Sequence, residues 1–180
     1  MTIMDYIQKG GVIMYILLLL SIIGITIIIF KIIIYKKFNK EISIFSEKIS
    51  NNLNYKTEQL VLKQIKDEIS LKVLNLEKGV GLVKTISTLA PLLGLLGTVI
   101  GILSSFEKIA SKGMDTSFFA SGISLALITT IGGLVVAIPH IIGYNYLIKR
   151  LDEIELSLEK EFTKNYLEKK WKEERQLDLI

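Results

Sequence analysis

The sequence has no cysteine and only one histidine among its 180 residues. Without cysteine, neither a disulfide framework nor a thiolate metal site can form, and one histidine supplies few ligands for a transition metal. A membrane enzyme that used His140 would lack a neighbouring nucleophile or acid pair. We therefore predict no metal, no cofactor and no catalytic residue.

Acidic residues are absent from three long apolar segments, residues 11–35, 86–106 and 118–148, and Lys31 is their one acidic or strongly basic residue. A helix of about 20 residues spans the hydrocarbon core of a bilayer. Residues 1–30 lack the basic start, short core and cleavage site of a signal peptide. We predict an all-α integral membrane protein with three transmembrane helices, in which Lys31 snorkels or lies at the interface.

The basic residues predict the topology of these spans. Residues 31–84 hold 11 lysines against 6 acidic residues, residues 149–180 hold 8 basic residues, and the charges within 107–117 cancel. Because basic flanks stay cytoplasmic, segments 36–85 and 149–180 are predicted inside, and segments 1–10 and 107–117 outside. The lysines flank apolar segments instead of forming a basic groove with aromatic residues, so nucleic acid is not the expected partner.

Both cytoplasmic segments are predicted to form helical extensions. Apolar residues recur at steps of three and four before the second span and after the third. They are Leu62, Ile65, Ile69, Val73, Leu76, Val80 and Val83, then Leu147, Leu151, Ile154, Leu158 and Phe162. We expect these helices to pack into a stalk. The alternative is that they lie flat on the lipid surface.

The second and third spans each carry a stripe of small and polar residues at helical spacing. The stripes are Ser87, Pro91, Gly94, Thr98, Gly101 and Ser105, then Ala126, Thr130, Gly133, Ala137, His140 and Tyr144. Small residues allow helices in a membrane to approach closely. The short segment 107–117 places the two spans antiparallel, with both threonines near mid-membrane. Each stripe is predicted to face protein or a narrow polar path.

Either threonine alone could satisfy its hydroxyl on its own helix backbone. Two threonines at one depth favour a shared surface that faces a polar path or an inserted partner. Proton-driven devices need a carboxylate or histidine within the membrane. His140 is the one candidate relay, with interfacial hydrogen bonding as its alternative role. A carboxylate would have to come from another protein.

The segments APLLGLLGTVIGILSSF (residues 90–106) and GISLALITTIGGLVVAIPHIIGYN (residues 122–145) closely resemble the ExbB and TolQ family, distant relatives of the MotA flagellar stator. The resemblance implies a subunit of the bacterial inner membrane, periplasmic at its N-terminus and cytoplasmic at its C-terminus. It further implies a homopentameric proton channel around a dimer of a single-span partner, ExbD or TolR.

In that family, proton flow drives motion that passes to TonB or a Tol component. Thr98 and Thr130 match the family threonines that face the partner's aspartate. Leu125 stands where many members carry glutamate. Of the functions considered, we favour an ExbB-like subunit. A TolQ-like subunit of a Tol-Pal system and a non-conducting scaffold, whose stripes only pack helices, are the alternatives.

Overall fold

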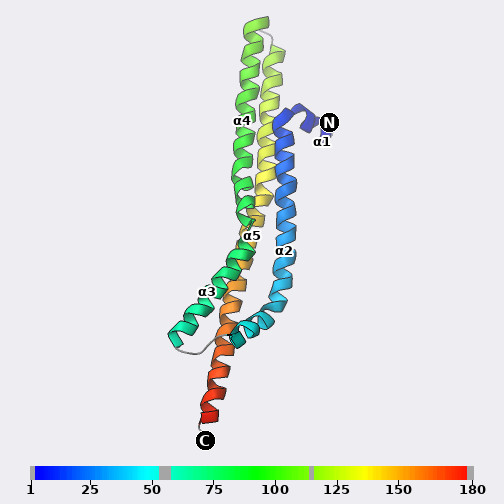
Figure 1. Cartoon of the computed structure of the whole chain (residues 1–180). Coiled ribbons are helices and arrows are strands. Elements are labelled where there is room, and N and C mark those ends of the chain that lie inside the picture. Colours follow the sequence, from blue (N-terminus) through cyan, green and yellow to red (C-terminus); the bar gives the residue numbers. More distant parts are fainter. Residues whose placement is uncertain (1–2, 53–57, 114–115, 178–180) are drawn as a thin grey trace. The chain divides into compact units, whose positions relative to one another are not determined.

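The computed structural model describes residues 3–52, 58–113 and 116–177. These residues form five α-helices and no strand: α1 (Ile3–Lys9), α2 (Gly11–Asn52), α3 (Glu58–Glu77), α4 (Val80–Lys112) and α5 (Thr116–Leu177). The predicted all-α fold is confirmed. Figure 1 shows the path of the chain through these helices.

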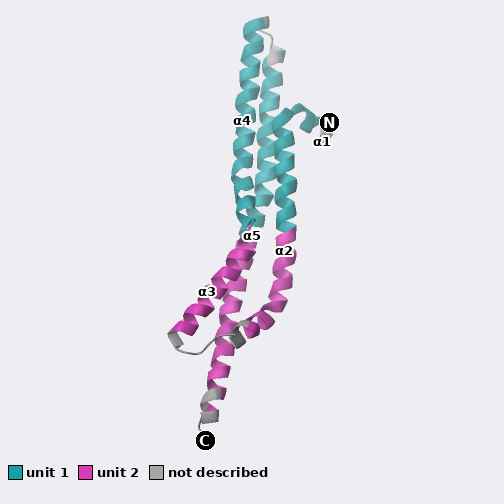
Figure 2. Ribbon diagram, viewed as in Figure 1, with its two compact units in different colours: residues 1–29, 79–145 teal, residues 30–78, 146–180 magenta. Residues whose placement is uncertain are grey.

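The chain divides into two units (Figure 2). Unit 1 comprises residues 1–29 and 79–145, and unit 2 comprises residues 30–78 and 146–180. Helices α2 and α5 each contribute to both units, so the continuous helix predicted to run from the third span into the polar C-terminal segment is present.

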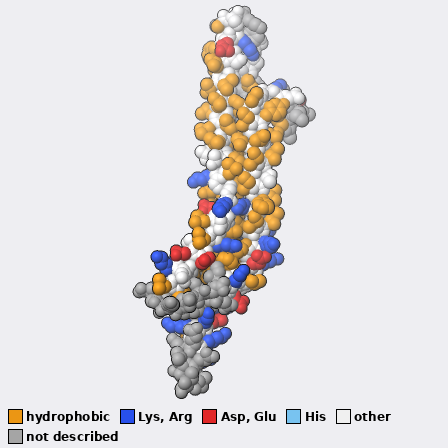
Figure 3. All heavy atoms as spheres, viewed as in Figure 1, with side chains coloured by type: hydrophobic (Ala, Val, Ile, Leu, Met, Phe, Trp, Pro, Cys, Tyr) orange, Lys and Arg blue, Asp and Glu red, His pale blue; other side chains and the backbone are white. Residues whose placement is uncertain are grey.

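Unit 1 packs α4 and the first parts of α2 and α5 around a small core. Leu17, Ile86, Ala90, Val136 and Ala137 are buried there. Many larger apolar side chains face outward instead, and Figure 3 shows hydrophobic side chains over much of the visible face of this unit. Among the described residues, α2, α4 and α5 each contain a stretch that is long and apolar enough to cross a membrane. The outward apolar surface is that of a multi-pass membrane protein.

The helices of unit 1 extend further than their apolar composition predicts. Helix α4 continues to Lys112 and α5 begins at Thr116, so most of the predicted loop 107–117 is helical. The single described residue between them is Gly113, with φ of 90°. Charged residues end the apolar run without ending the helix.

A second difference lies before the second span. The apolar spacing predicts one helix through residues 62–83, but α3 ends at Glu77 and α4 begins at Val80. Gly79 has φ of 87°, a left-handed conformation that glycine adopts at little cost. The helix therefore breaks at Gly79 while the apolar spacing continues.

Unit 2 packs α3 against the remaining parts of α2 and α5. The five residues predicted from the spacing after the third span are all buried. On α3, Val61, Ile65 and Ile69 are buried, whereas the predicted core residue Leu62 is 47% exposed. The core face of α3 therefore begins at Val61.

Lys31 is buried in unit 2 and does not snorkel. Its Nζ donates a hydrogen bond of 2.8 Å to the backbone oxygen of Leu76, which also accepts one of 3.1 Å from Tyr35 Oη. The last carbonyls of a helix lack partners within the helix. Lys31 and Tyr35 of α2 thus cap the C-terminus of α3.

Candidate functional site

Thr98 of α4 and Thr130 of α5 form the centre of the candidate site. Their Oγ1 atoms lie 2.6 Å apart, and either can be the donor. Thr98 Oγ1 also lies 3.2 Å from the backbone oxygen of Ala126 and 3.3 Å from that of Gly94, while Thr130 Oγ1 lies 3.4 Å from the latter. The two threonines predicted at one membrane depth therefore hydrogen-bond to each other.

The threonine pair has more acceptor capacity than it uses. Each hydroxyl has one proton and two lone pairs. One proton joins the two hydroxyls, and the second reaches a backbone carbonyl of Gly94 or Ala126. Three lone pairs remain. Both residues are partly exposed.

Glycines bring α4 and α5 close enough for this contact. A Cβ atom on Gly94 would lie 2.8 Å from the backbone oxygen of Thr129 and 3.1 Å from the Cα of Thr130. A Cβ atom on Gly133 would lie 2.5 Å from the backbone oxygen of Ala90. Real Cβ atoms hardly ever come this near, so both positions require glycine at the present helix separation.

The remaining stripe residues mostly pack within this chain. Those that are buried are Ser87, Gly94, Gly101 and Ser105 on α4, and Ala126, Gly133 and Ala137 on α5; Pro91 is partly buried. Ser87 and Ser105 donate to carbonyls of their own helix. Most of each stripe thus serves helix packing, while the threonine pair and Tyr144 are its partly exposed polar residues.

Thr129 was not singled out by the sequence. It is 1% exposed, and its Oγ1 donates to the backbone oxygen of Ala126 at 3.0 Å. A Cβ atom on Gly97 would overlap the Thr129 side chain. The sequence shows two adjacent threonines here, but the helical spacing of the stripe includes only Thr130. Thr129 fills the space that Gly97 leaves.

His140 is fully buried against the first span. Its Nδ1 lies 2.6 Å from the backbone oxygen of Val136, so this nitrogen carries a proton and donates it. Its Nε2 has no hydrogen-bond partner within the described part of the chain, and a Cβ atom on Gly24 of α2 would overlap it. The ring lies where only glycine leaves room. A relay role for His140 stays a prediction.

The chemistry of the site is limited to hydrogen bonding. A threonine hydroxyl does not release its proton near neutral pH, and the apolar segments contain no carboxylate. Leu125, which stands where many members of the resembling family carry glutamate, is partly buried beside Gly101. Over the described residues, no group of three metal-binding side chains is found. Any ion-binding carboxylate must come from elsewhere.

Residues 38–160, more than half of the chain, match the family described as the MotA/TolQ/ExbB proton channel family. The chain belongs to this family. Membership agrees with the three apolar helices and with the resemblance of residues 90–106 and 122–145. The MotA/TolQ/ExbB family is one of membrane transport proteins and not a known enzyme family.

Individual members of the MotA/TolQ/ExbB family give further matches. The chain is 29% identical over 182 residues to a protein described as an ExbB homolog from Methanothermobacter thermautotrophicus, covering 84% of this chain and 65% of that protein. It is 44% identical over 79 residues to biopolymer transport protein ExbB of Aquifex aeolicus, covering 43% and 53%. It is 44% identical over 87 residues to the ExbB of Helicobacter pylori, covering 48% and 60%. The matches span about half to two thirds of these relatives.

Proposed function

We propose that the chain is an ExbB-like stator subunit of an inner-membrane motor, which couples the proton motive force to TonB-dependent transport across the outer membrane. Family membership and the ExbB-named relatives support this function. The observation that carries the mechanism is the partly exposed hydroxyl pair of Thr98 and Thr130.

The proposed assembly is a homopentamer whose second and third spans surround a dimer of an ExbD-like single-span protein. The partner supplies a carboxyl group, because the apolar segments of this chain have none. When protonated, that group donates a hydrogen bond to a free lone pair of the threonine pair, and it gives up its proton on the cytoplasmic side. Five equivalent pairs would be met in turn, so successive steps rotate the partner. The proposal also places the N-terminus in the periplasm. The motion of the partner would be passed to a TonB-like protein.

Proton flux into liposomes tests this role of the threonine pair. Full-length protein would be reconstituted with and without an ExbD-like partner, as wild type and as Thr98→Val/Thr130→Val. Valine keeps nearly the same shape and removes the hydroxyl. One lost hydrogen bond of about 1 kcal/mol predicts roughly a fivefold decrease in partner-dependent flux.

Thr129→Val is the matched control, since its hydroxyl bonds only its own helix. It is expected to keep most of the flux. Unchanged flux in Thr98→Val/Thr130→Val would refute the role of the hydroxyls. The copy number of the purified complex tests the pentamer separately.

The burial of most stripe residues favours a second candidate, a scaffold that only packs helices. A scaffold would show no flux with or without the partner, so the same liposome measurement separates the two functions. A TolQ-like role in a Tol-Pal system differs only in the partners. It predicts co-purification with TolR-like and TolA-like proteins instead of ExbD-like and TonB-like ones.

A further inference from the structure

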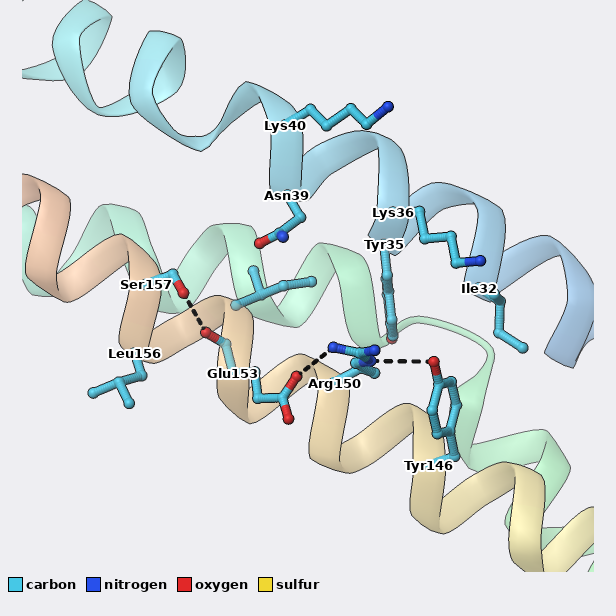
Figure 4. Close-up of a pocket in the computed structure, with 11 residues that line it drawn as sticks. Ile32, Tyr35, Lys36, Asn39, Lys40, Tyr146, Arg150, Glu153, Leu156 and Ser157 are labelled. Carbon is cyan, nitrogen blue, oxygen red and sulfur yellow. Dashed lines mark hydrogen bonds and ion pairs between the residues drawn. The ribbon is translucent and has the colours of Figure 1, made fainter.

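A groove of about 590 Å³ lies within unit 2, between α2 and α5. Figure 4 shows it in close-up, with Tyr35 reaching from α2 toward Arg150 on α5 and Asn39 pointing from α2 into the space between the two helices. None of its lining residues belongs to the threonine site. The proposed motor function leaves this groove unexplained.

Positive charge dominates the lining of the groove. Lys36, Lys40 and Arg150 contribute three cations, and Glu153 is the one acidic residue among the lining side chains. Among the described residues, neither lysine has an ion-pair partner. The Glu153 carboxylate offsets one cation, so two positive charges remain without a counterion.

The guanidinium of Arg150 is held in place at the groove. Its Nη1 lies 2.7 Å from Glu153 Oε2, its Nε donates to Tyr146 Oη at 3.1 Å, and the group lies 5.4 Å from the centre of the Tyr146 ring. The hydrogen bond to Tyr146, and then that to Glu153, raises the pKa of Arg150. A guanidinium oriented by these contacts presents its remaining donors in one plane, an arrangement that suits phosphate oxygens.

The groove begins where two apolar segments end. Its lining includes Ile32 and Tyr35 from the last turn of segment 11–35, and Tyr146 from the last turn of segment 118–148. In a chain that spans the membrane, this position corresponds to the depth of the lipid headgroups, where tyrosine is favoured. The exposed apolar side chains of Ile29 and Ile33 on α2 lie in the chain next to the first lining residue, Ile32.

We propose that this groove binds the phosphate-bearing headgroup of an anionic phospholipid. Basic pockets between membrane helices recognise such headgroups. Arg150 provides the fixed donor, and Lys36 and Lys40 add charge at the rim. In Figure 4 the ammonium of Lys40 extends along α2, and its flexible stem lets it turn toward a phosphate. Ile32 and Ile154 give the groove an apolar wall, which a lipid uses and a free phosphate ion does not.

Lipid retention by the purified full-length protein tests this proposal. The protein would be exchanged into mixed micelles with phosphatidylglycerol or phosphatidylcholine, and bound lipid counted by native mass spectrometry. Wild type is expected to retain phosphatidylglycerol preferentially. Each lysine near anionic lipid contributes about a fivefold increase in affinity, so Lys36→Gln/Lys40→Gln should bind roughly 25-fold more weakly.

Lys37→Gln/Lys63→Gln is the matched control. It removes the same charge from exposed positions outside the groove and should keep the preference. An equal loss in both double variants would overturn the proposal by showing general surface attraction. Equal retention of both lipids would overturn it too, as would displacement by millimolar inorganic phosphate or occupation of the groove by a second copy in a solved complex. None of these measurements needs proton flux, so the lipid site and the proposed motor can fail separately.

Discussion

Two neighbouring glycines on α5 allow a direct test of the contact that holds the threonine pair together. Gly133 faces the backbone of α4, whereas Gly132 faces the flexible side chain of Met14 on α2. Replacing either by alanine makes the same chemical change one residue apart. We predict that Gly133→Ala is markedly destabilising and that Gly132→Ala is nearly neutral.

The magnitude follows from what each new methyl group would meet. At Gly133 the Cβ would lie 2.5 Å from the backbone oxygen of Ala90 and 3.1 Å from the Cα of Gly94, so α4 and α5 must separate. Overpacking of this kind costs about 1–3 kcal/mol and can exceed that where only backbone can move. At Gly132 the Cβ would lie 2.5 Å from Met14 Sδ, which can rotate away. Alanine regains about 0.8–1.0 kcal/mol of helix propensity at both positions, so this gain cancels in the comparison.

The assay is reversible unfolding in mixed micelles with increasing dodecyl sulfate, followed by circular dichroism. Gly133→Ala should lower the free energy of unfolding by about 1–3 kcal/mol relative to Gly132→Ala. Separation of the helices should also lengthen the hydrogen bond between Thr98 and Thr130, one turn away, and reduce proton flux. Equal stability of the two variants would show that α4 and α5 are not in contact at Gly133.

Two further predictions concern contacts that join α2 to other helices. Lys31→Met should lower the free energy of unfolding by about 1–2 kcal/mol in the same assay, because the Leu76 carbonyl loses a charged donor and keeps only Tyr35. An unchanged unfolding midpoint would contradict the role of Lys31 as a cap of α3. Gly24→Ala should destabilise through overlap with the His140 ring, and combining it with His140→Ala should cost less than the sum of the two single changes, by about 1 kcal/mol or more in a double-mutant cycle. Additive effects would show that the two residues are not in contact.

The sequence was sufficient for the features that repeat along one helix. The spacing of Leu147, Leu151 and Leu158 predicted that α5 continues past its apolar segment, and all three are buried. On α3 the same reasoning chose Leu62, since Val61 and Leu62 are both apolar and spacing does not choose between adjacent positions. Contact with α2 and α5 decides which of the two residues is buried, and a local sequence pattern carries no information about that contact.

Contacts between distant segments lay beyond what the sequence patterns could give. Lys31 and Leu76 are 45 residues apart, and nothing in their local sequence pairs an ammonium with a helix-terminal carbonyl. The contact of Gly24 with His140 likewise depends on how α2 packs on α5. Thr98 and Thr130 were found because each lay on a stripe and the short connection placed the two stripes side by side.

The positions of the basic groups in the apolar segments bear on the proposal that a partner takes up the proton. Lys31 is committed to the C-terminus of α3, and His140 to Val136 with its other nitrogen facing Gly24. Neither is near a chain of acceptors among the described residues, and a threonine hydroxyl does not titrate near neutral pH. The threonine pair can therefore only lower the energy of a carboxyl group that arrives already protonated. If the proposed motor is correct, removing the hydroxyls should slow each step while leaving the number of protons per step unchanged, because the titrating carboxyl group would belong to the partner.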